Sequence, residues 1–97
     1  MASIVQQAAL ATRIDHALDY LLEEWLAIPE IVSTWESWEE PDRLDFVIEW
    51  PIREIRLKLL REWNDEGQLS AQQRQQFEEL ERLIQRHRAA VDRLLEE

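Results

Sequence analysis

Two histidines, His16 and His87, are the side chains of this 97-residue sequence best suited to proton transfer or metal binding, and neither has the neighbours that catalysis needs. The sequence has no cysteine and one glycine, which excludes cysteine nucleophiles, zinc–thiolate sites and glycine-rich phosphate loops. Bundles that hold two metals place a Glu three residues before each His, but Arg13 and Ile84 occupy those positions here. We therefore expect no catalytic residues; the alternative is a small helical enzyme that acts through one of the histidines.

His16 would share one face of a helix with Asp19, Tyr20 and Glu23. A single histidine among carboxylates is a weak metal-binding pattern, so we expect an exposed polar face and neither a metal nor a cofactor. His87 falls on an apolar seam, where protonation would add charge to packed surface. We interpret it as a core or interface residue rather than a pH sensor.

The segment that holds Trp35, Glu36, Trp38, Glu39 and Glu40 is the strongest candidate binding site. The sequence has five tryptophans, and two of them alternate with carboxylates here. Tryptophan buries a large rigid area at protein interfaces, and nearby acids steer a basic partner toward it. These five residues are predicted to bind another protein; the alternative is that the two indoles seal the end of the fold.

The net charge of −10 bounds the partners. Residues 1–50 carry 2 basic and 11 acidic side chains, whereas residues 51–97 carry 9 and 10. Such a field repels phosphate backbones, so nucleic acid is not an expected partner. The absence of cysteine and of a long apolar run or basic leader predicts a cytoplasmic protein with no membrane contact. A basic protein is the expected partner, and an antitoxin or inhibitor that masks one is the sharper version; ordinary solubility is the alternative reason for the acidity.

Apolar spacing predicts a helix over residues 4–28, because an apolar residue recurs there every three or four positions. Residues 29–38 are predicted to form a short second helix, with Pro29 in its first turn. Residues 39–42 carry turn-forming side chains, and we expect the chain to reverse there.

Residues 44–50 are ambiguous. Leu44, Phe46, Ile48 and Trp50 alternate with other residues as in a strand with one wet face, and a hairpin with residues 31–38 would follow. Read at helical spacing, the sequence instead gives an apolar stripe through positions 44, 48, 52, 55, 59 and 63. We prefer the helix, in which Pro51 either causes a kink or begins a new helix.

The last helix is predicted to run from Ser70, which forms a capping box with Gln73, to the C-terminus. Its length of roughly 40 Å exceeds the span of a compact domain of this size, and its apolar seam is broad, so we expect a homodimer. The residues predicted for self-association are Phe77, Leu80, Ile84, His87, Val91 and Leu94.

Residues 62–73 separate the last two predicted helices and resemble the calcium loop of EF-hand proteins. Glu62, Asn64 and Glu66 match its oxygen-bearing positions, and Gly67 matches its turn glycine. The resemblance implies a cation site, but Gln73 stands where that family has a bidentate Glu. The capping roles of Gly67 and Ser70 explain the same residues without a cation, and we prefer that interpretation.

Taken together, these patterns predict an all-α fold, a single domain over residues 1–97, in which three long helices and one short helix form a small bundle. An α+β fold with a β-hairpin near residues 31–50 is the alternative. We expect a non-enzymatic, self-associating, acidic module for protein–protein interaction.

Overall fold

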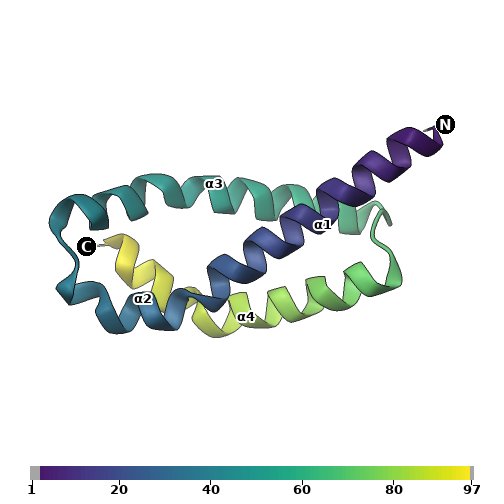
Figure 1. Cartoon of the computed structure of the whole chain (residues 1–97). Coiled ribbons are helices and arrows are strands. Elements are labelled where there is room, and N and C mark those ends of the chain that lie inside the picture. The colour runs from purple at the N-terminus through teal and green to yellow at the C-terminus, as the bar shows by residue number, and fades with distance from the viewer. Residues whose placement is uncertain (1–2, 97) are drawn as a thin grey trace.

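The computed structural model describes residues 3–96, which form α-helices joined by short connections. Helix α1 spans Ile4–Leu26, α2 spans Ile28–Thr34, a 3-10 turn (η1) spans Trp35–Ser37, α3 spans Glu40–Asp65 and α4 spans Ala71–Glu96. In Figure 1, α2 continues α1 after a bend, and α3 and α4 form the other long limbs. The predicted all-α bundle of three long helices and one short helix is confirmed.

The alternative hairpin near residues 31–50 is wrong, because the residues described by the structure contain no strand. The alternating pattern has a helical cause. Phe46 and Trp50 are buried in the core, whereas Leu44 and Ile48 are 56% and 64% exposed. Helix α3 therefore has apolar residues on two opposite faces, and the two interleaved stripes imitate the period of a strand.

Helix α1 begins at a capping box, in which the Ser3 hydroxyl accepts a hydrogen bond from the Gln6 N–H at 3.1 Å. Its predicted apolar stripe is buried from Ile14 to Trp25. The helix ends at Leu26, and α2 starts at Ile28. Pro29 lies in the first turn of α2, where its missing N–H costs no hydrogen bond. The short helix and the 3-10 turn that follows it together span residues 28–37, one residue earlier at each end than the predicted range of 29–38.

The chain reverses slightly before the predicted turn at residues 39–42. Trp38 and Glu39 are extended, and Glu40 and Pro41 already belong to the first turn of α3. Acidic side chains in that turn stabilise the helix, because they lie at the positive end of its dipole. Pro51 lies inside α3, which continues through it as one helix, so Pro51 does not begin a new helix. Packing on both sides of Pro51 sustains the helix, although this residue cannot donate the usual backbone hydrogen bond.

The connection from α3 to α4 has the predicted caps. Gly67 has a φ of +74°, a left-handed conformation that glycine adopts without strain. The Ser70 N–H donates to Oε1 of Gln73 at 2.9 Å, and the Gln73 N–H donates to the Ser70 hydroxyl at 3.1 Å. This reciprocal pair is the capping box expected from the sequence.

The core lies mainly between α1 and α4, with α2 also packed on α4. Helix α3 packs mainly against α1 and makes fewer contacts with α4. Polar bridges supplement that contact: Arg61 of α3 makes two hydrogen bonds to Glu81 of α4, at 2.7 and 3.0 Å. The hydrogen bond to Glu81 raises the pKa of Arg61 above its ordinary value. Among residues 3–96, no helix lies against the long side of α3 that carries Ile48 and Ile55.

The bundle is long and thin, with extents of 50 × 23 × 17 Å and a radius of gyration of 15.5 Å. A compact domain of this length would have a radius of about 12.5 Å. Helix α4 needs no second copy to match its length, because α3 has the same 26 residues and runs antiparallel to it (Figure 1). Helix length is therefore no sign of self-association in this chain.

Candidate functional site

The structure places the five residues predicted to bind a partner at the end where α2 meets α3. Glu36, Glu39 and Glu40 are exposed, and Trp38 is half-buried. Trp35 is only 4% exposed and belongs to the core, so its ring supports the surface rather than contacting a partner. The indole N–H of Trp38 donates to the Thr34 hydroxyl at 3.0 Å, which fixes the orientation of that ring.

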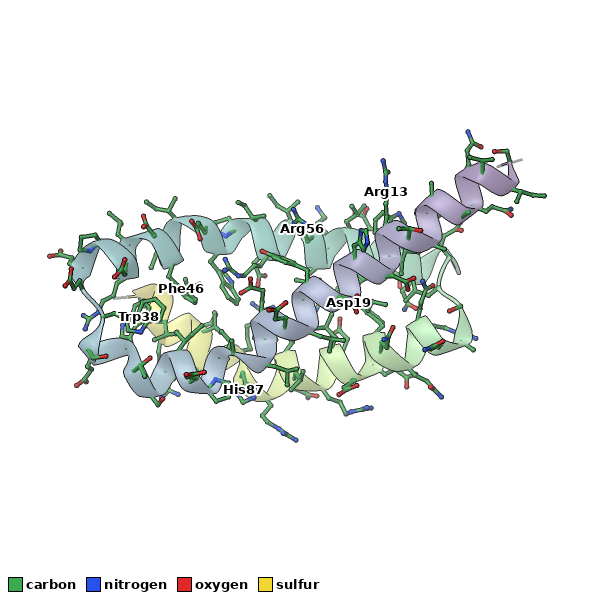
Figure 2. The ribbon with its side chains drawn as sticks, viewed as in Figure 1. Arg13, Asp19, Trp38, Phe46, Arg56 and His87 are labelled. Carbon is green, nitrogen blue, oxygen red and sulfur yellow. The ribbon has the colours of Figure 1, made fainter. Side chains whose placement is uncertain are left out.

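An aromatic cluster stiffens this end of the bundle. The Phe46 ring centroid lies 5.4 Å from those of both Trp35 and Trp50, and 6.2 Å from that of Trp38. Trp25 of α1 completes the cluster through an edge contact with Trp50, at 5.3 Å. Rings at these distances pack favourably, so the surface that Trp38 and Phe46 present is held rigidly (Figure 2).

An open hollow of about 680 Å³ lies beside Trp38. Ile31, Trp38 and Phe46 give it an apolar floor. Carboxylates form most of the remaining lining, and they come from the η1–α3 connection and from successive turns of one side of α3. The acidic lining residues are Glu39, Asp42, Asp45 and Glu49.

Arg53 closes one end of the hollow, but its charge is already partnered. Its guanidinium lies 3.2 Å from a carboxylate oxygen of Glu24 and stacks 5.2 Å from the Trp50 ring centroid. Within the described residues, the buried Nε of Arg53 has no hydrogen-bond acceptor. The hollow therefore keeps a net negative lining over an aromatic floor, which suits a cationic side chain with an apolar stem.

Sequence reasoning found Trp38 and Glu39 but missed three carboxylates of the hollow. Asp42, Asp45 and Glu49 lie three and four positions apart, which is the spacing of one helix face. This signal was readable once residues 44–50 were taken as helical. The preferred helical interpretation thus places these three carboxylates on one face, whereas the alternative strand would place Asp42 on the opposite face from Asp45 and Glu49.

The residues predicted for self-association lie in the core of the single chain. Phe77, Leu80, Ile84, Val91 and Leu94 are at most 8% exposed, and His87 is half-buried. They pack in the cluster that α4 forms with α1 and α2. A second copy would reach them only if this core opened, so the α4 seam provides no free surface for a dimer.

Neither histidine gathers a reactive cluster. His16 is exposed on α1, beside exposed Asp19 and Glu23, and Figure 2 shows His87 near the middle of α4. In the part of the chain that the structure describes, no group of three His, Cys, Asp or Glu residues could hold a metal ion. Among the same residues, no helix is both long enough and apolar enough to cross a bilayer.

Gln73, the last residue of the EF-hand-like loop, is buried and makes hydrogen bonds to α1. Gln73 is 6% exposed, and its side-chain N–H group donates to the Ala11 carbonyl at 3.2 Å and to the Asp15 carboxylate at 2.8 Å. Its oxygen accepts from the Ser70 N–H. Gln73 thus joins the start of α4 to α1, and a bidentate Glu could not donate these hydrogen bonds.

Comparison with known proteins gives no relative from which a function could be transferred: no family model, no curated protein and no solved structure matches the chain.

Proposed function

We propose that this protein is a non-enzymatic interaction module that binds a basic segment of another protein in the hollow beside Trp38. The single observation that carries the proposal is the joining of an aromatic floor to four carboxylates in one open hollow. Lysine and arginine stems pack on aromatic rings while their charged ends reach nearby acids. Turnover would need an activated nucleophile or a positioned acid–base pair, and the proposal invokes neither.

The distribution of charge supports a basic partner over a neutral one. The acidic lining adds to a first half of the chain that carries 11 acidic and 2 basic side chains. Charges at the rim of an interface chiefly raise the association rate and select the partner, whereas the buried aromatic contacts hold the complex together. Masking of a basic protein, as by an antitoxin or inhibitor, is the form of this function that the acidic surplus favours.

A defined peptide tests the proposal. We expect a fluorescent peptide of alternating lysine and leucine to bind, and a peptide with glutamate in place of lysine to remain free. Binding should weaken as salt is added, because the carboxylates are exposed to screening. Anisotropy measures both affinities.

Matched charge variants separate the hollow from the overall charge. The double variant Asp42→Asn with Glu39→Gln should weaken binding about tenfold, which corresponds to about 1.4 kcal/mol for two rim charges. The control, Asp19→Asn with Glu23→Gln, removes the same charge from exposed positions on α1 and should leave the affinity within about twofold. Equal effects of the two pairs would show that net charge alone attracts the peptide and would overturn the proposal.

A further inference from the structure

Helix α3 exposes a continuous apolar stripe on the side that no other helix of the described part of the chain covers. Leu44, Ile48, Ile52, Ile55 and Leu59 are between 42% and 67% exposed. Contiguous apolar surface of this kind marks an interaction site on a folded protein. We propose that the stripe is the interface of an antiparallel homodimer, in which α3 pairs with α3 of a second copy about a twofold axis near Ile52.

The spacing of the stripe is nearly the same in both directions. Its residues follow one another at steps of four, four, three and four, with Ile52 in the middle. Reversing the helix about that point places Leu44 where Leu59 was, and Ile48 where Ile55 was. A twofold interface requires such self-complementarity, because each copy presents the same surface to the other.

The charges of α3 select a second copy and fix its direction. Residues 40–50 carry four acidic side chains and one basic, whereas residues 51–61 carry four basic and one acidic. Antiparallel pairing sets the acidic half of each helix against the basic half of the other, and parallel pairing would set like charges together. A uniformly basic or uniformly acidic partner would be repelled by one half of α3. The charges of α3 are therefore more complementary to those of a second, antiparallel α3 than to either kind of partner.

One edge of the stripe shows this complementarity residue by residue. Asp45, Glu49 and Arg56 are exposed, and at about 100° per residue they lie within about 40° of one another around the helix. A twofold axis sets like edges of the two helices side by side, so Arg56 of each copy faces Asp45 and Glu49 of the other. These are inter-copy ion pairs that a single chain cannot form.

A hollow of about 360 Å³ between α1 and α3 gives the end of the stripe a receiving surface. It is lined by Leu59, Arg56 and Trp63 of α3 and by Arg13 of α1, among others. Antiparallel pairing brings Leu44 of the second copy to this hollow, together with the acidic first turns of its α3. Figure 2 shows Arg13 and Arg56 on this side of the molecule, where their charges would meet those acids.

The dimer goes beyond the proposed binding of a basic segment and stands on a different surface. The apolar floor of the hollow beside Trp38 faces the opposite side of α3 from Ile48 and Ile55. Asp45 and Glu49 border both surfaces, so stripe variants are the ones that separate the two ideas. A stripe variant such as Ile55→Glu should lose the dimer and keep peptide binding. A wild-type chain that binds the peptide but stays monomeric would overturn the dimer alone and leave the proposed function standing.

Sedimentation equilibrium from micromolar to millimolar concentration tests self-association. The wild-type chain should approach the mass of two copies, and Ile55→Glu should raise the dissociation constant at least about 100-fold, because it buries a charge at a contact made twice. The matched control is Leu26→Glu, at a residue 59% exposed on α1 and off the stripe. A wild-type chain that stays monomeric throughout, or that forms larger oligomers, overturns the proposal.

Charge exchange tests the edge contacts. Arg56→Glu should weaken the dimer about tenfold, and adding Asp45→Arg and Glu49→Arg to it should restore the wild-type constant. Failure of the triple variant to recover, while its helical content by circular dichroism is unchanged, contradicts the pairing.

Single cysteines test the direction, since the chain has none of its own. Ile52→Cys should form a disulfide-linked dimer on mild oxidation, because the axis brings that residue near its own copy. Leu44→Cys alone should not, since antiparallel pairing separates the two copies of that residue by about 22 Å. A mixture of Leu44→Cys and Leu59→Cys should cross-link. Self-cross-linking of Leu44→Cys would indicate parallel pairing and overturn the proposal.

Discussion

Truncation to alanine should destabilise the chain on one apolar face of α3 and have little effect on the other. Leu57 is 1% exposed and lies in the core, whereas Ile55, two residues away, is 67% exposed. Removing a buried leucine side chain costs about 2–5 kcal/mol, because the transfer energy is lost and a cavity remains. Leu57→Ala should therefore lower the free energy of unfolding by about 3 kcal/mol.

Ile55→Ala should leave the isolated chain nearly unchanged. Full burial of an isoleucine side chain is worth about 1.5–3 kcal/mol, and a residue that is two-thirds exposed gains about one third of it, or about 0.5–1 kcal/mol. Alanine has a better helix propensity by about half a kcal/mol, which offsets most of that loss. The expected change in the free energy of unfolding is within about 0.5 kcal/mol.

Urea unfolding, followed by circular dichroism in dilute solution, measures both variants against the wild-type chain. At higher concentration, self-association adds stability to the wild-type chain by mass action, and Ile55→Ala should lose that addition. A cost for Ile55→Ala as large as that for Leu57→Ala in dilute solution would refute the outward placement of the stripe. A cost for Leu57→Ala below about 1 kcal/mol would refute the placement of Leu57 in the core.

Two further changes test contacts that join the helices. Gln73→Ala removes a capping box and two hydrogen bonds to α1, so it should lower the free energy of unfolding by about 2 kcal/mol. The control Gln72→Ala, at an exposed position, should change that free energy little. Equal effects of the two variants in denaturant unfolding would contradict the role of Gln73. Because its hydrogen bond to Glu81 raises the pKa of Arg61, the stability that Arg61 gains from this pair is present at neutral pH and is lost as pH rises through that raised value. Arg61→Gln should therefore cost about 0.5 kcal/mol, discounted for exposure, at both about pH 6 and about pH 9, and a cost found at only one pH would contradict this.

Helix positions and their caps were largely predictable from the sequence, because they follow from local rules. The three-and-four spacing through Leu18 and Trp25 predicted the buried face of α1, and Gly67, Ser70 and Gln73 predicted the turn before α4. These features need only the helical period and the chemistry of caps.

The sequence did not predict which apolar face of α3 is buried and which is exposed, because that depends on which face packs against another helix. The stripe that contains Ile48 and Ile55 reads as a core face, yet the buried side of α3 is the opposite one. There, Trp25 of α1 packs on Trp50, and the indoles of Trp35 and Trp38 pack on Phe46. Periodicity identifies an apolar face without saying what lies against it. Similarly, the hollow requires Ile31 of α2 to lie beside α3, and that contact follows from the chain reversal after η1.

The most direct test of the proposed function is a titration of ¹⁵N-labelled protein with the lysine–leucine peptide, followed by NMR. The indole N–H of Trp38 and the backbone amides of Asp42 and Phe46 line or border the hollow, and their resonances should shift together and saturate. Shifts that are absent, or that spread over the acidic face of Asp15 and Asp19 while Trp38 stays still, would contradict binding at the hollow.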